Sequence, residues 1–188
     1  MNNKIILFCG PSGSGKTTIS QYLLQHNPTL CFSVSATTRQ MRTNERDGED
    51  YYFMSKEEFE KRIANNEFIE WEEVYTGIYY GTLREEVERI WSLGKHAIFD
   101  VDVMGGLNIK QKFGDKALAV YVMPPSIEIL KERLVARNSE TPESLEQRIA
   151  KASIEMGYAK QFERKIINDN LEDSFLKATE ILKDFLES

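Results

Sequence analysis

The stretch that most restricts the fold of this chain runs from Gly10 to Thr17 and reads Gly-Pro-Ser-Gly-Ser-Gly-Lys-Thr. It fits the pattern G-x-x-x-x-G-K-[ST], follows the apolar run Ile5–Cys9 and precedes the helix-forming segment Thr17–Gln25. Glycines in such a loop let successive backbone N–H groups converge on phosphate oxygens, and the following helix adds the positive end of its dipole. A chance glycine-rich turn seldom matches every position in this setting. The sequence therefore predicts a cradle for the phosphates of a nucleoside triphosphate.

The side chains of this loop and two nearby acids predict a metal-assisted site. Lys16 is expected to reach the β- and γ-phosphates of ATP, and the Thr17 hydroxyl is a candidate ligand of Mg²⁺. The predicted ATP contacts of the loop are Gly10, Pro11, Ser12, Gly13, Ser14, Gly15, Lys16, Thr17 and Thr18. Asp100 and Asp102 share one face at the end of a predicted strand, where carboxylates face the ligand crevice of such sheets. We expect Asp100 in the Mg²⁺ shell and Asp102 near the acceptor, with a solvated loop acid as the alternative for each.

Short apolar runs alternate with amphipathic stretches along most of the chain. The expected buried strands are Ile5–Cys9, Ala97–Phe99, Ala117–Met123 and Lys165–Ile167. The expected helices are Thr17–Gln25, Met104–Lys112, Ile127–Arg137 and Leu171–Leu186. This alternation predicts an α/β fold with a mainly parallel sheet flanked by helices. With the phosphate loop, the expected fold is of the P-loop NTPase type.

Residues 33–82 do not follow this alternation of apolar runs and amphipathic stretches. They hold a polar loop, the strand-like Tyr51-Tyr52-Phe53, and a short helix that Ser55 and Glu58 would open as a capping box. Phe68–Tyr75 and Ile78–Tyr80 flank Thr76-Gly77 and predict a hairpin. Thr82 with Glu85 offers a second capping box. We interpret this stretch as an inserted lobe with a small mixed sheet, over the edge of the main sheet.

A second insertion, residues 126–158, is charged and helical. Thr141-Pro142 is the expected N-cap and first residue of a helix. A charged helical insertion of this kind could serve as a mobile lid. The predicted organisation is one domain, 1–188, with a core of 1–32, 83–125 and 159–188, a lobe of 33–82 and a lid of 126–158.

Composition limits the classes of partner. The net charge of −6 excludes a broad, sequence-independent grip on nucleic acid, so an anion site must be a local cluster of basic residues. Cys9 and Cys31 are the only cysteines and are expected to be reduced thiols. The run Ile5–Cys9 is too short for a signal-peptide core or a membrane span. The expectation is a soluble cytoplasmic protein with small-molecule substrates and no nucleic-acid or membrane partner, and self-association into a homo-oligomer stays open.

The polar segment after residue 33 holds the candidate acceptor site. Arg39 and Arg42 lie close together there, with Glu45 and Tyr51 following. Paired guanidinium groups can hold a phosphate through directed, charge-assisted hydrogen bonds. Tyr51 and Tyr80 could add phenol donors, and half-buried aromatic packing is the alternative for both.

Taken with the phosphate loop, this segment resembles the guanylate kinase family. The residues that carry the resemblance are Ser35, Thr37-Thr38-Arg39, Arg42, Glu45, Gly48, Tyr51, Asn66–Trp71, Tyr79–Thr82, Asp100-Val101-Asp102, Arg133, Leu134, Arg137 and Asn168-Asp169. They cover essentially the whole chain in order. The resemblance implies a nucleotide-binding core, a GMP-binding lobe and a lid. It also implies transfer of the γ-phosphoryl group of ATP to GMP, or to dGMP, giving ADP and GDP.

The resemblance also implies roles residue by residue. The GMP phosphate would be held by Arg39, Arg42, Tyr51 and Tyr80. The guanine would be surrounded by Ser35, Glu70, Thr82 and Asp102. The ATP side would gain Arg133, Arg137, Asn168 and Asp169, with Asn168 approaching the adenine. The expected catalytic residues are Lys16, Arg42, Arg137 and Arg148, although a solvated basic helix face is the commoner fate of such arginines.

Glu70 also suits guanine on chemical grounds. Guanine presents N1–H and its 2-amino group on one edge, and a carboxylate can accept from both. Adenine offers an unprotonated N1 there, so the carboxylate would be left without a donor. An exposed strand acid is the alternative reading, because Glu67, Glu72 and Glu73 make the segment acidic in any case.

One position departs from the family pattern. Proline usually stands between the two phosphate-gripping arginines, and this chain has Met41. Loss of the fixed φ angle of proline could loosen the loop. The departure puts substrate affinity in doubt and leaves the chemistry unchanged.

Two other functions fit parts of the sequence. A guanylate-kinase-like protein-binding module would keep the fold but bind partner proteins, and such modules typically have degraded phosphate loops. This chain keeps the functional positions Lys16, Thr17, Arg39 and Arg42. A P-loop kinase for another phosphorylated small molecule, such as a ribose bisphosphate, is the second alternative. It is disfavoured by three residues that suit a purine edge, Ser35, Glu70 and Thr82.

Overall fold

The structure is a computed structural model of the 188-residue chain that describes residues 3–136 and 142–188. The strands are β1 (Ile5–Cys9), β2 (Leu30–Phe32), β3 (Ser35–Thr37), β4 (Tyr51–Phe53), β5 (Phe68–Tyr75), β6 (Ile78–Leu83), β7 (His96–Val101), β8 (Ala117–Met123) and β9 (Arg164–Ile167). The α-helices are α1 (Lys16–His26), α2 (Lys56–Ala64), α3 (Arg84–Ser92), α4 (Val103–Phe113), α5 (Ile127–Ala136), α6 (Pro142–Gly157) and α7 (Leu171–Glu187). Two short 3₁₀ turns, Gly114–Lys116 and Tyr158–Gln161, precede β8 and β9.

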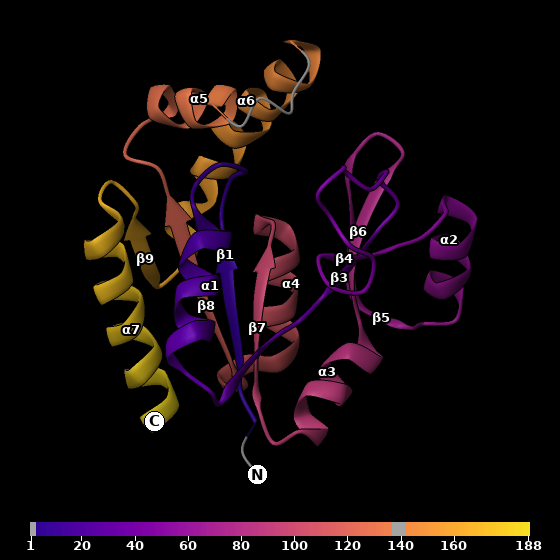
Figure 1. The fold of residues 1–188 in the computed structure, drawn as a ribbon, viewed down its shortest axis with the longest axis horizontal. Helices are drawn as coiled ribbons and strands as arrows, with labels where there is room; N and C mark the ends of the chain where they lie inside the picture. The colour runs from indigo at the N-terminus through magenta and orange to yellow at the C-terminus, as the bar shows by residue number, and fades with distance from the viewer. Residues whose placement is uncertain (1–2, 137–141) are drawn as a thin grey trace.

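The main sheet is parallel, with the order β2-β7-β1-β8-β9, and β1 lies at its centre (Figure 1). Alternate residues of β1 enter two separate cores. Ile5 and Leu7 pack with α3 and α4 on one face, whereas Ile6 and Phe8 pack with α1 and α7 on the other. A strand covered on both faces is apolar throughout, which explains the uninterrupted run Ile5–Cys9. The α/β fold expected from the sequence is confirmed.

A second, smaller sheet has the order β4-β3-β6-β5 and stands beside the main one (Figure 1). Strand β3 pairs parallel with β4 and antiparallel with β6, so the sheet is mixed as expected. Its own small core is formed by Ala36, Phe59, Phe68 and Leu83, with Phe59 supplied by α2. Because this core is separate from those of the main sheet, the second sheet folds as a distinct layer.

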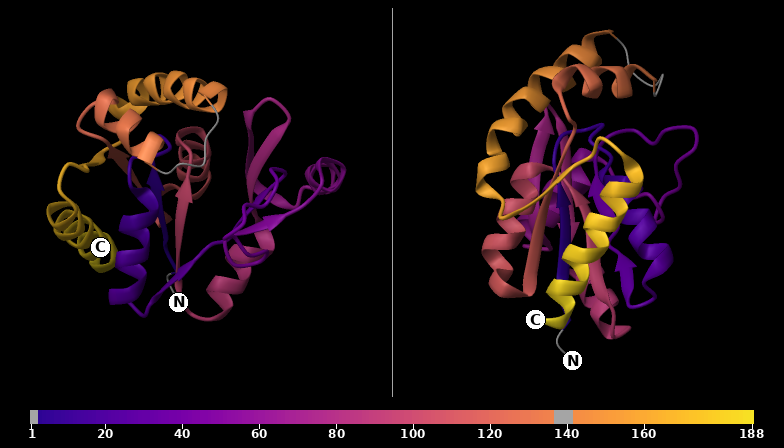
Figure 2. Two further views of the ribbon diagram at one scale, coloured as in Figure 1. Left: turned by 45° about the horizontal axis from the view of Figure 1, so that its top comes forward. Right: turned by 90° about the vertical axis from the view of Figure 1, so that its left-hand side faces the viewer.

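Helices α5 and α6 pack on each other around Leu130, Leu134 and Ala152. Figures 1 and 2 show this pair lying across the carboxyl ends of β1 and β8. The sequence predicted α5 to end at Arg137, which lies outside the described residues, as does the expected cap Thr141. Helix α6 begins at Pro142, the predicted first residue. Within the described part of the chain, no helix is long and apolar enough to cross a membrane.

The local signals in the second sheet were partly right. Ser55 caps α2 by accepting a hydrogen bond from the Glu58 backbone N–H, as predicted. The second capping box was wrong, because α3 begins after Leu83 and has no side-chain cap. The Thr82 hydroxyl instead donates to Glu70 Oε1 at 2.7 Å across the β5–β6 hairpin. The sequence analysis also missed β2, whose three residues are too few to show a period.

A buried carboxylate joins the two sheets where the chain passes between them. Glu86 in α3 is 1% exposed. It accepts hydrogen bonds from the backbone N–H of Val34 (3.0 Å), from the Tyr52 hydroxyl (3.2 Å) and from Arg89 (2.8 Å). Burial acts to raise the pKa of Glu86, but the hydrogen bonds from Arg89 and Val34 outweigh it and hold the pKa below its usual range. Val34 leads into β3 and Tyr52 lies in β4, so Glu86 ties the second sheet to the core.

We predict that Glu86→Gln lowers the free energy of unfolding by about 1–3 kcal/mol at pH 7, because the Arg89 guanidinium loses its charged partner at a buried acceptor. The pKa of Glu86 is depressed in the folded state, so this stabilisation is present above the unfolded pKa and is lost as pH falls through the folded one. The difference between the two proteins should therefore shrink toward pH 3–4. Urea unfolding at pH 7 and at pH 3–4 measures this difference in stability, with the exposed Glu88→Gln on the same helix as control. Equal stability of the Glu86→Gln and Glu88→Gln variants at pH 7 would contradict the prediction.

Candidate active site

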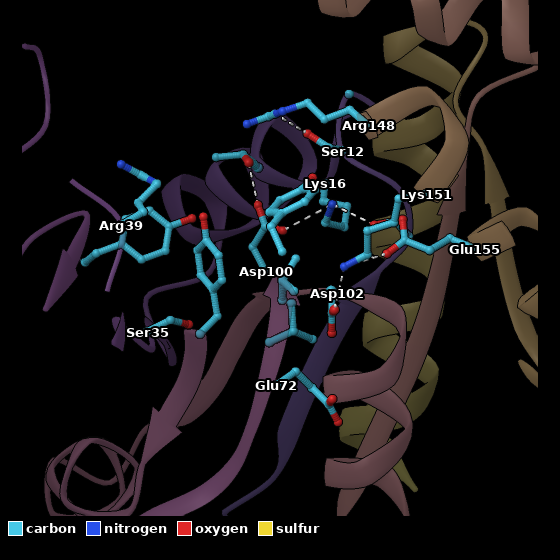
Figure 3. A pocket seen from close by; sticks show the side chains of 18 of the residues that line it. Ser12, Lys16, Ser35, Arg39, Glu72, Asp100, Asp102, Arg148, Lys151 and Glu155 are labelled. Carbon is cyan, nitrogen blue, oxygen red and sulfur yellow. Dashed lines mark hydrogen bonds and ion pairs between the residues drawn. The ribbon is translucent and has the colours of Figure 1, made fainter. Parts of the chain in front are cut away.

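One pocket lies between the carboxyl ends of the main sheet, the second sheet and α6. Figure 3 shows Arg148 and Lys151 reaching into it from α6, Asp100 and Asp102 from the end of β7, and Arg39 from the loop after β3. The predicted residues that line it are Gly10, Ser12, Gly13, Gly15, Lys16, Thr17, Ser35, Arg39, Arg42, Tyr51, Glu70, Tyr80, Asp100, Asp102 and Arg148. Segments far apart in the sequence therefore meet around a single space.

The phosphate loop follows β1 and is held in a conformation that needs glycine. Gly10 and Gly15 have φ angles of 141° and 98°. A Cβ atom at Gly10 would lie 2.1 Å from the Val122 carbonyl oxygen, and one at Gly15 would lie 2.0 Å from Asn168 Nδ2. Any larger residue at either position would push the loop away from β8 or from Asn168. Close contacts with Val122 in β8 and with Asn168 after β9 therefore fix the shape of the loop.

Lys16 and Thr17 open α1 directly beside Asp100. Lys16 Nζ donates to the carbonyl oxygens of Gly10 (2.9 Å) and Pro11 (3.2 Å) and lies 3.6 Å from Asp100 Oδ1. The Thr17 hydroxyl donates to Asp100 Oδ2. Parallel pairing of β1 with β7 sets Phe8 opposite Asp100, so both strands end at the same level. The placement that the sequence predicted for Asp100, beside the loop, is what the structure has.

A second pocket lies beside the phosphate loop. It is lined by Gly13, Gly15, Thr18, Arg133, Ala136, Asn168 and Leu171. The Asn168 side chain donates to the Ser14 carbonyl oxygen at 2.8 Å and accepts from Ser174 at 3.0 Å, while its backbone carbonyl accepts from Arg133 at 2.9 Å. The predicted ATP-side residues Thr18, Arg133 and Asn168 therefore gather here. Pro11, Ser14 and Asp169 are not among the lining residues of either pocket.

The two arginines of the acceptor loop are organised by Glu45. Arg39 forms a bidentate pair with it, at 2.6 Å (Nη1–Oε2) and 2.7 Å (Nη2–Oε1). The backbone N–H of Arg42 donates to the same carboxylate at 2.9 Å. The hydrogen bond from Arg39 holds the pKa of Glu45 below its usual range, against the opposing effect of burial. The Arg39 guanidinium also lies 4.8 Å from the centroid of the Tyr51 ring.

Met41, at the position where the family pattern has proline, is 54% exposed. The Glu45 carboxylate accepts from the Arg39 side chain before this residue and from the Arg42 backbone N–H after it, so one carboxylate closes the loop across Met41. Glu45 was part of the family resemblance, but the sequence analysis gave it no role.

Glu70 lines the pocket from the second sheet, whereas its predicted neighbour Thr82 is not among the lining residues. They sit opposite each other on β5 and β6, and Thr82 is fully buried. Burial raises the pKa of Glu70 to about 7, although the hydrogen bond from Thr82 lowers it and Asp102 raises it further. A Cβ atom at Gly105, in the first turn of α4, would lie 2.8 Å from Glu70 Oε2. The missing side chain there leaves room for the carboxylate.

Asp102 follows β7 directly. It is the N-cap of α4, and its Oδ1 accepts a hydrogen bond from the Gly105 backbone N–H at 2.8 Å. Its second oxygen, Oδ2, lies 3.2 Å from Lys151 Nζ. Asp102, at the start of α4, and Glu70, on the second sheet, therefore line the same pocket.

The sequence analysis missed several pocket residues, the most prominent being Lys151, Glu155, Glu72 and Tyr75. Lys151 and Glu155 follow Arg148 at helical spacings of three and seven residues, which place all three on one face of α6. Arg148 Nη1 donates to the Ser12 hydroxyl at 3.0 Å. That spacing was the available signal, because a helix that turns Arg148 to the phosphate loop must turn Lys151 and Glu155 to the same pocket.

Comparisons with known proteins agree on the family. The family model described as guanylate kinase matches residues 2–188. Guanylate kinases from Bacteroides fragilis and Bacteroides thetaiotaomicron are 50% and 52% identical to this chain, covering 97% and 99% of it and 90% and 91% of their own lengths. A crystal structure of guanylate kinase from Anaplasma phagocytophilum matches with a TM-score of 0.79 at 27% identity, over 97% of this chain and 85% of that chain. The chain therefore belongs to the guanylate kinase family.

Proposed function

We propose that this protein transfers the γ-phosphoryl group of ATP to GMP, or to dGMP, and so forms ADP and GDP in purine nucleotide metabolism. Its family supports this reaction. The observation that carries the proposal is that the loop lysine Lys16, the arginine pair Arg39 and Arg42, and the carboxylate of Glu70 all line one pocket. Two nucleotides placed phosphate to phosphate need cations between them and a base-recognising group at the acceptor end.

We assign the acceptor contacts by chemistry. Arg39, Arg42, Tyr51 and Tyr80 would hold the GMP phosphate, because their guanidinium and phenol groups are donors grouped on one side of the pocket. Glu70 would accept from guanine N1–H and the 2-amino group, with Thr82 fixing the carboxylate and Ser35 and Asp102 flanking the base. The donor, ATP, would lie along the phosphate loop with its adenine toward Arg133, Asn168 and Asp169.

The chemistry that this arrangement suits is direct in-line transfer. A GMP phosphate oxygen attacks the γ-phosphorus; the bond to that oxygen forms as the bond to the β–γ bridging oxygen breaks, and ADP leaves without a phosphoenzyme. No general base is required, because a phosphate oxygen is already largely deprotonated near neutral pH. Lys16, Arg42, Arg148 and Arg137, the last outside the described residues, would neutralise charge during the transfer.

The residues beside the phosphate loop fit Mg²⁺. A hydroxyl and a carboxylate meet there, Thr17 and Asp100, and hard oxygen donors of this kind are what the ion prefers. Mg²⁺ would be held by Thr17 and Asp100, directly or through water, and would neutralise charge on the β- and γ-phosphates. Lys16, already 3.6 Å from Asp100, would share that task from the protein side.

We also propose a division of labour along the chain. Residues 33–82 would act as the GMP-binding lobe and residues 126–158 as the lid, and the remaining segments would form the core. Closure of lobe and lid would exclude water, which would otherwise hydrolyse ATP. The cytoplasm, where ATP and GMP are available, is the expected place of the reaction.

The function is tested by measuring ADP production from ATP and Mg²⁺ with a panel of acceptors. We expect turnover with GMP and dGMP, at least about 100-fold lower kcat/KM with AMP because of the unpaired carboxylate, and none with ribose bisphosphates. ATP alone should give negligible ADP, since the closed site needs the acceptor. A folded protein that binds neither nucleotide would favour the protein-binding alternative, and turnover with another phosphorylated acceptor would favour a different kinase.

Glu70→Gln tests the base-recognition argument. We predict that this change lowers the ratio of kcat/KM for GMP over AMP by about 10- to 100-fold, because the amide places a donor where guanine also donates. The kcat at saturating GMP should fall less than this ratio, since Glu70 is remote from the phosphates. Steady-state kinetics with both acceptors measure the effect, with the exposed Glu88→Gln as control. An unchanged preference for GMP would refute the role of Glu70.

The same substitution should stabilise the protein in a pH-dependent way. The pKa of Glu70 is raised to about 7 in the folded state, from an ordinary value of 4.5, so the folded protein binds more protons than the unfolded chain between these values. Stability from this group is therefore lost as pH rises from about 4.5 to 7. We predict that Glu70→Gln raises the free energy of unfolding by about 1–3 kcal/mol at pH 8 and by much less at pH 5. Chemical denaturation at the two pH values checks the sign, and a variant less stable than wild type at pH 8 would contradict it.

A further inference from the structure

Lys151 on α6 contacts three parts of the chain at once. Its Nζ lies 3.2 Å from Asp102 Oδ2 at the end of β7, and 3.5 Å from Glu155 Oε1 one turn along its own helix. It also lies 5.4 Å from the centroid of the Tyr75 ring, at the tip of the β5–β6 hairpin. Figure 3 shows Lys151 extending from α6 toward Asp102. One side chain thus bridges the proposed lid, the core and the proposed GMP-binding lobe.

Both oxygens of Asp102 are held by separate elements. Oδ1 accepts from the backbone N–H of Gly105 in the first turn of α4, and Oδ2 pairs with Lys151. A carboxylate fixed at only one oxygen can still rotate about its Cβ–Cγ bond, whereas one fixed at both cannot. Lys151 therefore sets the orientation of an acid that lines the pocket beside Glu70.

Lys151 is also placed to offset repulsion among carboxylates. Glu70 and Glu72 from β5, Asp102 at the start of α4 and Glu155 from α6 all line this pocket. Like charges this close disfavour one another, and a cation among them relieves the repulsion. Without Lys151 the acids would be expected to separate, and the wall that faces the base would lose its shape.

The partner of Lys151 on the same helix face is Arg148, three residues earlier. Arg148 Nη1 donates to Ser12 in the phosphate loop, and its guanidinium carbon lies 6.0 Å from the centroid of the same Tyr75 ring. One face of α6 therefore touches the ATP side through Arg148 and the GMP side through Lys151, with Tyr75 against both. This arrangement gives the helix a contact with each end of the pocket.

We propose that Lys151 is a positioning residue for GMP: by holding Asp102 and packing against Tyr75, it aligns the base-facing wall of the pocket as α6 covers it. The inference rests on the proposed function and deepens it, since it assigns part of acceptor affinity to the lid. The inference gives the two cations of α6 different roles: Arg148 acts near the transferred phosphoryl group, and Lys151 acts near the nucleobase.

Selectivity between the two substrates distinguishes this role from a purely structural one. The side chains of Lys151 and Asp102 are 25% and 22% exposed, and both residues line the pocket. A largely buried ion pair also affects folding stability, because removal of one partner leaves the other without its counter-charge. Loss of Lys151 should therefore lower the melting temperature somewhat, but it should weaken the binding of GMP far more than that of ATP, which a general loss of structure would not do.

Lys151→Met, which keeps most of the apolar stem, is the test, with Lys151→Arg as the conservative variant. Lys183→Met is the matched control, because Lys183 forms an i,i+4 ion pair with Glu187 on α7, away from both pockets. We expect Lys151→Met to raise KM and Kd for GMP about five- to tenfold, while KM for ATP and kcat change less than about twofold. Lys151→Arg should recover most of the affinity, and Lys183→Met should match wild type.

A double-mutant cycle tests the contact with the lobe. If Tyr75 holds Lys151 in place, Lys151→Met should raise KM for GMP by a smaller factor in a Tyr75→Leu background than in wild type. Additive effects would overturn this part of the inference. Equal losses in kcat and in both KM values would assign Lys151 a structural role and overturn the whole.

The two proposals fail in distinguishable ways. A wild-type protein that binds GMP but does not phosphorylate it would refute the proposed function, and calorimetric Kd values for wild type and Lys151→Met would still decide the role of Lys151. A wild-type enzyme active on GMP, with Lys151→Met equal to it in KM and Kd, would refute the role of Lys151 alone.

Discussion

The parallel pairing of β1 with β7 is the constraint on which the rest of the site depends. It sets Phe8 level with Asp100, so the phosphate loop that leaves β1 meets the carboxylate that ends β7. Two helices also begin at this carboxyl end of the sheet. Helix α1 begins with Lys16 and Thr17, and α4 is capped by Asp102. Pairing between β1 and β8 then supports the loop from behind at Gly10. Backbone hydrogen bonds between these strands therefore bring the functional residues together.

Local sequence signals predicted the elements whose causes are local. Strands β1 and β8 were predicted at their observed bounds, because both are apolar runs buried on two faces. The cap at Ser55 was also found, since its partner lies three residues away. Thr82 was misread because its partner, Glu70, is on another strand. The contacts of Lys151 with Asp102 and Tyr75 are also non-local, although its helical spacing from Arg148 was a local signal that both residues share one face of α6.

The site holds acids in places that do not favour their charge. Burial raises the pKa of Glu70, because its carboxylate is less well solvated in the pocket than in water. The hydrogen bond from Thr82 offsets part of that cost, and a base that donates two hydrogen bonds would offset more. Under the proposed function, base recognition and folding stability therefore oppose each other at Glu70. Glu86, by contrast, is buried with a full set of donors, and its charge supports the fold.

The hydrogen bonds that Glu45 accepts from Arg39 and Arg42 affect how tightly this loop can bind an anion. Because the Glu45 carboxylate pairs with Arg39 through two hydrogen bonds and lies 3.8 Å from Arg42, an arriving dianion would compete for donors already in use. Inorganic phosphate and other small anions, which have no second anchor, should dwell there only briefly. Under the proposed function, a nucleotide would be held longer, because its base would add contacts with Glu70 elsewhere in the pocket. A phosphate site of moderate affinity would let the enzyme release its product and bind the next substrate.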